Sequence, residues 1–276
     1  MAVPIGGDMK DGDHSSRRFF LLRTLAGVFT GLLPAWATAT ASVGRKAGSA
    51  EGDLEKIAAL LSGKTRGVWV FTGDSITQGA KHTHGQRSYP EIFAERLRWE
   101  LARVGDVVVN TGMSGHTTRH VLNDMDWRVG QFRPWVVSVM LGTNDCARNQ
   151  VTLADFEANL TSIVAQVRAM NAVPILHTPN PIIAEKAPER ASLPEYVAVI
   201  RKVAGRENAI LVDHYAEWDS AMASRSAEAV RRERLNDPLH PNQTGHRQLA
   251  QALFKKLNIF DPAQPTCGAA YYEGEH

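Results

Sequence analysis

Five short apolar runs recur along the chain, separated by longer stretches of mixed polarity. They cover residues 67–73, 106–112, 135–142, 173–178 and 209–213. Each run is almost continuously hydrophobic, which is typical of parallel strands that are covered on both faces. The pattern therefore predicts five strands in one mostly parallel sheet.

The stretches between these runs show helical periodicity. Ser88 and Glu91 have the spacing of a capping box and predict the start of a helix. Three apolar stripes at helical spacing are formed by Phe93, Leu97, Leu101 and Val104, by Leu153, Phe156, Leu160, Ile163, Val167 and Met170, and by Leu249, Leu253 and Leu257. Strands that alternate with helices favour right-handed crossovers, so we expect an α/β fold: a single three-layer α/β/α sandwich of the flavodoxin-like kind.

The N-terminal segment has a different composition. Ser16, Arg17 and Arg18, followed by two apolar residues, resemble a twin-arginine export signal, and a moderately apolar stretch and an Ala-x-Ala pattern at 37–41 follow. We expect a signal peptide at 1–41, a linker at 42–52, one folded domain at 53–260 and a C-terminal tail at 261–276. A short membrane anchor is the alternative, but the apolar stretch is shorter than the roughly 20 residues that a spanning helix needs.

The signal predicts that the protein is exported, to the periplasm or the extracellular space, without stable membrane anchoring once the signal is removed. The 276 residues include 31 basic and 29 acidic side chains without long runs of one sign, so the charge gives no case for nucleic-acid binding. Cys146 and Cys267 are too few for a disulfide framework and lack the spacing of a zinc site. Whether the two cysteines pair stays open.

Small, polar and ionisable residues gather where the predicted strands end. Ligands of parallel α/β sheets bind beyond the carboxyl ends of the strands, so these residues are expected to share one site. Ser75 follows the first strand, and Asp237 and His240 lie three positions apart just before the last helix. Because serine is a weak nucleophile unless a base activates it, we predict that Ser75 bonds to His240 and that Asp237 orients the imidazole.

Acyl transfer also needs hydrogen-bond donors for the negative charge on the carbonyl oxygen. The backbone N–H groups of Ser75 and Gly115 and the side-chain amide of Asn144 follow three different strands and could supply them. Asp145 is expected to close its loop by accepting hydrogen bonds from backbone N–H groups. These residues complete a predicted site for a Ser-His-Asp hydrolase.

Four blocks carry a family resemblance: "GDSITQG", "NTGMSG", "GTND" and "DPLHPN". In this order they resemble the SGNH hydrolases, also called GDSL esterases and lipases, over roughly residues 66–258. The resemblance implies that Ser75 is the nucleophile, that Gly115 and Asn144 are oxyanion donors, and that no metal or other cofactor is needed. His116 departs from the pattern, since many members carry an acidic residue after the glycine of the second block.

Two other signatures are absent. Position 77 is Thr, so Ser75 is not part of a Gly-x-Ser-x-Gly nucleophile elbow, and Gly79 is not followed by Lys-Ser/Thr as in a phosphate-binding loop. The sequence therefore favours a serine esterase for short acyl groups, above all O-acetyl groups on carbohydrates. Alternatives are a lysophospholipase or thioesterase for longer acyl chains, and a non-catalytic carbohydrate-binding or flavodoxin-like module.

Further polar side chains are candidates for substrate contact. His116 follows an oxyanion donor, and Arg87 and Arg119 could meet a substrate carboxylate, whereas Tyr89 and Trp127 are expected to be packing residues. The numerous histidines leave a metal site as an alternative, formed by His82, His84, His116, His120, His177 or His214. We interpret the His-x-His pair, His82 and His84, as solvated or substrate-facing.

Overall fold

The computed structural model describes residues 49–271. The expected signal peptide at 1–41 and most of the expected linker lie outside the described residues. Within residues 49–271, no helix combines the length and the apolar character that a bilayer-spanning segment requires.

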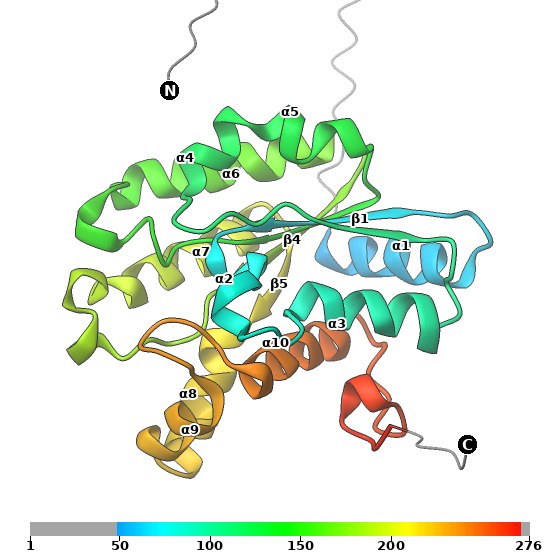
Figure 1. Cartoon of the computed structure of the whole chain (residues 1–276). Coiled ribbons are helices and arrows are strands. Elements are labelled where there is room, and N and C mark those ends of the chain that lie inside the picture. Colours follow the sequence, from blue (N-terminus) through cyan, green and yellow to red (C-terminus); the bar gives the residue numbers. More distant parts are fainter. Residues whose placement is uncertain (1–48, 272–276) are drawn as a thin grey trace, which may run out of the picture. The chain divides into compact units, whose positions relative to one another are not determined.

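A five-stranded sheet forms the centre of the domain (Figure 1). Its strands are β1 (Val68–Gly73), β2 (Val107–Asn110), β3 (Val136–Met140), β4 (Val173–Thr178) and β5 (Ile210–Asp213). Their order is β2-β1-β3-β4-β5, and every neighbouring pair is parallel. The predicted parallel sheet is confirmed, and each strand lies within its predicted run.

The strands end together at one edge of the sheet. Gly73 pairs with Met140, and Thr178 pairs with Asp213, so the segments that follow β1, β3, β4 and β5 emerge side by side. This register brings residues that are far apart in the sequence to one edge, where the sequence predicts the functional site.

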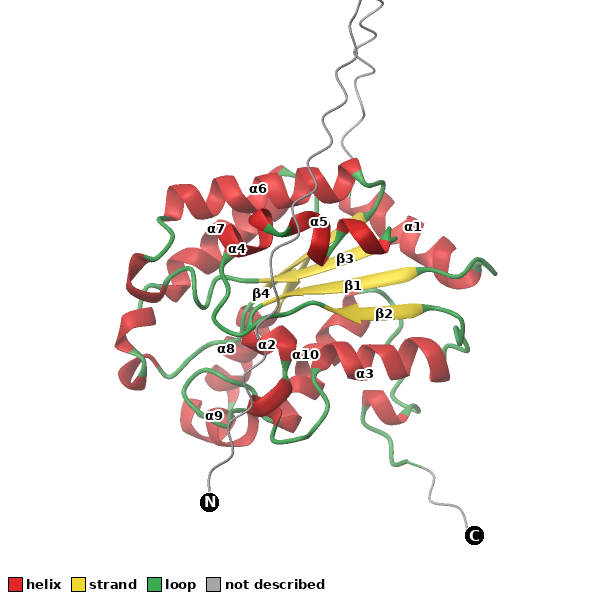
Figure 2. Ribbon diagram, turned by 45° about the horizontal axis from the view of Figure 1, so that its top comes forward, coloured by secondary structure: helices red, strands yellow, loops and turns green. Residues whose placement is uncertain are grey.

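Helices cover both faces of the sheet (Figure 2). They are α1 (Ala50–Ser62), α2 (Ser75–Gln78), α3 (Tyr89–Glu95), α4 (Thr118–Asn123), α5 (Met125–Arg128), α6 (Leu153–Ala169), α7 (Leu193–Arg206), α8 (His214–Ser224), α9 (Ala227–Arg234) and α10 (Gln243–Lys256). One face packs against α4 to α7, and the other packs against α1, α3 and α10. The predicted three-layer sandwich is therefore confirmed.

Alternation along each strand supplies both halves of the core. Val70 and Val137 belong to the cluster under α6 and α7, whereas Trp69, Phe71 and Val136 belong to the cluster under α3 and α10. Successive side chains of a strand point to opposite faces, so a run that is apolar throughout can serve two layers. The continuous hydrophobic runs in the sequence reflect this double burial.

Two predicted packing positions are wrong. Val104 is 68% exposed. The helix α3 ends at Glu95, a π-helical turn (Arg96–Glu100) follows it, and Val104 lies beyond this turn, outside the helix. Trp127 is 59% exposed because the four-residue helix α5 buries Met125 and Arg128 instead. The capping box is present, with the Glu91 carboxylate accepting from the Ser88 N–H at 2.6 Å.

Ordered structure extends past both expected ends of the folded domain. The Ser49 hydroxyl caps α1, which begins at Ala50. After α10, the turn Pro265–Cys267 (η7) packs onto the domain and buries Cys267. Cys146 and Cys267 are both free and buried, and they belong to hydrophobic clusters on opposite faces of the sheet, which keeps their thiols apart.

Candidate active site

The end of β1 leads directly into the helix that carries Ser75. The Asp74 side chain caps α2 by accepting from the Ile76 N–H at 2.9 Å, and Ser75 is the first helical residue. Ser75 Oγ lies 2.8 Å from His240 Nε2, and its residue is only 7% exposed. The hydrogen bond predicted between these two side chains is confirmed.

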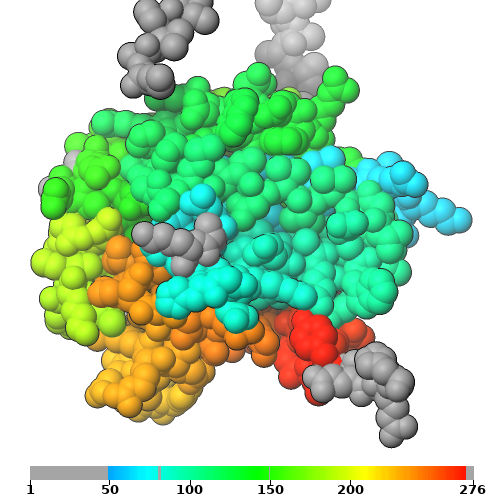
Figure 3. All heavy atoms as spheres, in the orientation of Figure 1, coloured from blue at the N-terminus to red at the C-terminus, as the bar shows by residue number. Residues whose placement is uncertain are grey.

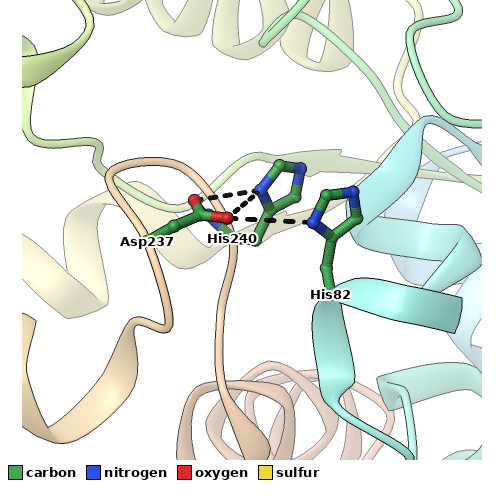
Figure 4. Close-up of side chains that lie close together, drawn as sticks. All are labelled: His82, Asp237 and His240. Atoms are coloured by element: carbon green, nitrogen blue, oxygen red, sulfur yellow. Dashed lines mark hydrogen bonds and ion pairs between the residues drawn. The ribbon is translucent and has the colours of Figure 1, made fainter.

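A tight turn before α10 holds His240 and Asp237 together. His240 Nδ1 lies 2.8 Å from Asp237 Oδ2 and 3.0 Å from Oδ1 (Figure 4). Asp237 Oδ1 also accepts from the backbone N–H groups of Leu239 and His240, both at 2.8 Å. The carboxylate therefore shapes the turn and faces the imidazole at the same time.

Electrostatics keep Asp237 charged. Burial raises the pKa of Asp237, but the hydrogen bonds from Leu239 and His240 outweigh burial, so that the pKa lies below its ordinary value. A charged carboxylate beside His240 Nδ1 favours the tautomer that carries a proton there and leaves Nε2 as an acceptor toward Ser75. This is the protonation state that a general base needs.

Two backbone donors lie at the start of α2 and in the loop after β2. Within residues 49–271, the N–H groups of Ser75 and Gly115 have no hydrogen-bond acceptor. Gly115 has a φ of +80°, and a Cβ atom there would meet no other atom within 4 Å. Glycine is therefore required by the backbone conformation, and its N–H stays unshielded.

Asn144, in the loop after β3, lies beside these donors. Its Nδ2 donates to the His116 carbonyl at 3.2 Å and to Asp74 Oδ2 at 3.5 Å. Its Oδ1 accepts from Arg190 Nη2 at 3.4 Å, and Arg190 Nε also donates to the Thr143 carbonyl at 3.0 Å. Arg190 was not predicted from the sequence, because its segment after β4 has no pattern that links it to Asn144.

Two buried aspartates support this edge. Burial raises the pKa of Asp74 to about 7, although its hydrogen bond from Ile76 opposes the shift. Asp145 accepts from the Thr118 N–H and hydroxyl and from the Gly142 N–H, as expected for a loop-closing residue. Asp74 thus connects the start of α2 to Asn144, and Asp145 connects the loop after β3 to the start of α4.

The side chain of His116 supports the loop after β2, which carries Gly115. Its Nδ1 contacts the guanidinium of the fully buried Arg128, and its ring lies 4.5 Å from the His120 ring between centroids. Burial lowers the pKa of His116, and the Arg128 charge lowers it further. Arg128 in turn donates to the Thr111 carbonyl at 3.2 Å, so it links α5 to the loop that carries Gly115.

The other predicted contact residues lie elsewhere. Arg87 forms an ion pair with Glu95, and Arg119 forms one with Asp155 at 2.8 Å. Both arginine side chains are more than half exposed, and no described contact joins them to Ser75 or His240. The structure therefore does not bring them into the site in this state.

One cluster of metal-ligand residue types occurs among the described residues: His82, Asp237 and His240, whose ligand atoms lie within 4.8 Å of one another. The His82 and His240 rings stack with centroids 3.5 Å apart and planes 9° apart. Nearly parallel rings point their in-plane lone pairs side by side rather than toward one point, which is a poor arrangement for a shared ion. The stacking of His82 was not predicted; only the His-x-His pattern drew attention to this loop.

The cyan and orange parts of the chain, which include the segments that carry His82 and His240, meet on one face of the molecule (Figure 3). A groove of about 690 Å³ adjoins this place and reaches Asp237. Its lining consists of Ile183, Lys186, Glu228, Arg231, Arg232, Leu235, Asn236, Asp237 and Pro238. Asp237 is the residue of the predicted site that lines this groove, whereas Ser75 and His240 are not part of its lining.

Comparison with known proteins agrees with this geometry. The profile of the GDSL-like Lipase/Acylhydrolase family matches residues 71–248. The chain belongs to this family. Ester hydrolysis by a serine hydrolase is the activity that this membership indicates, and the family segment contains all of the residues placed at the sheet edge above.

An acetylxylan esterase of Geobacillus stearothermophilus is 28% identical to this chain over 208 residues, which cover 69% of this chain and 93% of the relative. An uncharacterized protein of Mycoplasma pneumoniae is 33% identical over 126 residues, 44% of this chain and 13% of that protein. The first relative is matched along nearly its whole length, whereas the second is matched only in part.

Solved structures give the same result. The crystal structure of Axe2, an acetylxylan esterase from Geobacillus stearothermophilus, superposes with a TM-score of 0.59 at 27% identity, covering 69% of this chain and 94% of that one. LAE5, an enzyme from the metagenome of Lake Arreo, Spain, gives 0.60 at 26% identity, covering 70% and 95%. Catalytic mutants of Axe2 replace a serine, an aspartate and a histidine, and its aspartate and histidine are three positions apart, as Asp237 and His240 are here.

Proposed function

We propose that this protein is a serine esterase that removes O-acetyl groups from carbohydrates, with Ser75, His240 and Asp237 as its catalytic triad. The observation that carries the proposal is a continuous hydrogen-bond network. Ser75 Oγ lies 2.8 Å from His240 Nε2, and His240 Nδ1 lies 2.8 Å from Asp237 Oδ2. The acetyl-carbohydrate substrate is supported by the acetylxylan esterase that matches most of this chain.

In the first half of the reaction, His240 Nε2 takes the proton of the Ser75 hydroxyl as Ser75 Oγ attacks the ester carbonyl. The negative charge that develops on the carbonyl oxygen is stabilised by the N–H groups of Ser75 and Gly115, which have no acceptor among residues 49–271. Asn144 is the third donor, and its long 3.5 Å contact with Asp74 is the one that an oxyanion would replace. As the bond between the acyl carbon and the sugar oxygen breaks, the His240 imidazolium gives its proton to that oxygen, and the sugar leaves with a free hydroxyl.

In the second half, a water molecule takes the place of the sugar. His240 Nε2 accepts a proton from this water as it attacks the acetyl-enzyme, and the same donors stabilise the second oxyanion. Asp237 remains charged throughout and stabilises the imidazolium form of His240, which is consistent with its lowered pKa. As the bond between Ser75 Oγ and the acyl carbon breaks, His240 gives the proton to Ser75 Oγ, acetate leaves and the Ser75 hydroxyl is restored.

The surroundings of the triad favour a polar substrate over a lipid. The groove that reaches Asp237 contains the charged side chains of Lys186, Glu228, Arg231 and Arg232. A long acyl chain would gain little by binding there, because burying it requires apolar walls. A purely carbohydrate-binding module would have no use for a serine bonded to a histidine that a carboxylate orients.

The purified protein should release acetate from acetylated xylo-oligosaccharides and should hydrolyse p-nitrophenyl acetate faster than esters of longer chain length. A matched Ser75→Ala variant separates enzymatic from spontaneous release. Preference for long-chain esters would favour the lipase or thioesterase alternative, and acetate release that the variant retains would exclude Ser75 as the nucleophile.

We also propose that residues 1–41 direct export through the twin-arginine route. Ser16-Arg17-Arg18 and the apolar stretch that follows support this proposal. Replacing both arginines by lysine should leave the full-length precursor in the cytoplasm of a bacterial host, whereas the unchanged chain should reach the periplasm or the medium. Equal export of both forms would contradict it.

A further inference from the structure

A second imidazole covers the ring of His240. His82 lies in the short turn Ala80–Thr83 (η1) that follows α2, and its ring stacks on His240 with centroids 3.5 Å apart and an interplanar angle of 9°. Its Nδ1 lies 3.8 Å from Asp237 Oδ2. Figure 4 shows the two rings face to face, each with Nδ1 turned toward the same carboxylate.

Backbone hydrogen bonds hold His82 in this place from two directions. Its N–H donates to the Gly79 carbonyl at 3.0 Å, which ties it to the end of the helix that carries Ser75. Its carbonyl accepts from Asn236 Nδ2 at 2.6 Å, which ties it to the residue before Asp237. The turn therefore connects the two segments whose relative position determines the distance between Ser75 and His240.

The His240 ring needs such support. The χ2 torsion of histidine is broad, so packing or hydrogen bonds must fix the plane of the ring. Its two nitrogens contact Ser75 and Asp237, yet Asp237 presents both carboxylate oxygens at 2.8 and 3.0 Å and its side chain is 40% exposed. The two hydrogen bonds alone leave the His240 ring some freedom to rotate about χ2. The His82 ring, packed flat against one face of it, restricts this rotation.

We propose that His82 is a positioning residue: by stacking, it holds the His240 ring in the plane in which Nε2 meets Ser75 and Nδ1 meets Asp237. This inference rests on the proposed role of His240 as the base. Stacked aromatic rings attract one another beyond the area that they bury, so the contact favours one orientation of the His240 ring.

Stacking, rather than charge, is the component that matters. The 3.8 Å separation of His82 Nδ1 from Asp237 Oδ2 is longer than a hydrogen bond, and the Asp237 carboxylate is 40% exposed to water, which weakens an ion pair. Phenylalanine at position 82 keeps a flat ring without the nitrogen, and glutamine keeps a polar group without the ring. The two replacements therefore separate the two contacts.

The test compares His82→Phe and His82→Gln with wild type, and His84→Asn serves as the matched control. His84 is exposed in the same loop and has a φ of +51°, which asparagine tolerates. We would measure kcat and KM on p-nitrophenyl acetate, the rate of inactivation by an alkyl fluorophosphonate, and the unfolding midpoint. The fluorophosphonate reports the reactivity of Ser75 whatever the natural ester is.

His82→Gln should lower kcat and the inactivation rate about tenfold, equivalent to about 1.4 kcal/mol of transition-state stabilisation, with little change in KM. His82→Phe should retain both rates within about threefold, because its ring still covers His240. The control should match wild type, and all three variants should unfold near the wild-type midpoint.

Equal rates in all forms would overturn the proposal, as would an equal loss in the Phe and Gln variants, which would assign the effect to the Asp237 contact. A change in KM alone would make His82 a substrate contact instead. Inhibition of wild type by added zinc that His82→Phe abolishes, together with unchanged kcat in both variants, would indicate a metal site. If Ser75→Ala remained active, the proposed function itself would fail, independently of these results.

Discussion

The protein contains two serine–histidine hydrogen bonds of the same length in very different surroundings. Ser75 Oγ lies 2.8 Å from His240 Nε2 at the open edge of the sheet, and Ser138 Oγ lies 2.8 Å from His177 Nε2 in the core. The His240 side chain is 12% exposed, whereas His177 is 1% exposed. Distance alone therefore does not distinguish a catalytic pair from a structural one.

The partner on the other ring nitrogen distinguishes them. His240 Nδ1 faces the charged Asp237, but His177 Nδ1 faces His214 Nε2 at 2.9 Å. Burial lowers the pKa of His177 well below its ordinary value, and the neighbouring imidazole lowers it further. A base must be able to accept a proton, so the comparison teaches that Ser75 can be activated and that Ser138 cannot.

The largest expected effect breaks the first pair. Ser75→Ala should lower kcat by about 10⁶-fold, the loss typical of removing a triad serine, and should leave the unfolding midpoint nearly unchanged. Ser138→Ala should do the reverse. Its kcat should stay close to wild type, but His177 Nε2 would be buried without a hydrogen-bond partner, which should lower the unfolding free energy by about 1–3 kcal/mol. Ester hydrolysis and urea denaturation of both variants measure this contrast. A Ser138→Ala protein that is stable but inactive would contradict it.

The next effect removes the feature that distinguishes the two histidines. Asp237→Asn should lower kcat about 10⁴-fold, because a neutral amide neither favours the reactive tautomer of His240 nor stabilises its imidazolium form. The N–H groups of Leu239 and His240 can still donate to the amide oxygen, so the turn should persist. Kinetics at several pH values and an unchanged unfolding midpoint would support this expectation, whereas near-normal kcat would show that His240 does not depend on a carboxylate.

Acidification should unfold the protein through its buried histidines. The pKa values of His214 and His246 are lowered by burial to about 3, and that of His177 is also lowered. These groups stay neutral in the folded protein but take up protons in the unfolded chain below about pH 6.5, so the stability that they contribute is fully present above that pH and is lost as the pH falls toward 3.

Buried carboxyl groups oppose this slope. Burial raises the pKa of Asp74 to about 7, so the folded protein keeps that proton and Asp74 contributes stability that is present below about pH 4 and lost as the pH rises to 7. Asp145 acts in the same direction as Asp74. Burial also raises the pKa values of Glu217 and Asp219, which act in the same direction as the two aspartates, so replacing a single histidine isolates its contribution to the slope.

Urea unfolding monitored by circular dichroism at each pH measures this slope. His246→Asn should flatten it, because the amide oxygen can accept from the Tyr89 N–H as His246 Nδ1 does and carries no titratable proton. His84→Asn, in an exposed loop, should leave the slope unchanged. A His246→Asn variant with the same pH dependence of unfolding free energy as wild type between pH 7 and 5 would contradict the assignment of a neutral buried His246.

The smallest expected effect concerns a third kind of histidine. His116 faces the Arg128 guanidinium instead of a carboxylate, and its backbone carbonyl accepts from Asn144 Nδ2. His116→Ala should lower kcat/KM about tenfold, or about 1.4 kcal/mol, by loosening the loop that aims the Gly115 N–H. Loss on both a small ester and an acetylated sugar would locate the effect in the oxyanion loop, loss on the sugar alone would indicate substrate contact, and no loss would show that the ring has no role.

The sequence predicts the frame of this site better than its fine structure. Doubly buried parallel strands have a distinct hydrophobic pattern, and their ends identify Ser75, Gly115 and Asn144 before any coordinates are known. Asp237 and His240 follow from their spacing in one tight turn. Such features can be predicted from the sequence because each depends on a few residues that are neighbours along the chain.

Contacts between distant irregular segments leave no such pattern. His82 meets His240 across 158 positions, and Arg190 reaches Asn144 from the segment after β4. The exposure of Val104 and Trp127 likewise depends on where helices end, which periodicity predicts poorly. These features follow from tertiary packing rather than from spacing.

The most direct test is to identify the serine that reacts. Incubation of the folded protein with an alkyl fluorophosphonate, followed by peptide mass spectrometry, should yield one adduct on the peptide that contains Ser75 and none in the Ser75→Ala variant. The buried Ser138 and the exposed Ser114 should stay unmodified in both proteins. An adduct on either of them, or one that persists in Ser75→Ala, would contradict the assignment of Ser75, His240 and Asp237 as the hydrolytic centre.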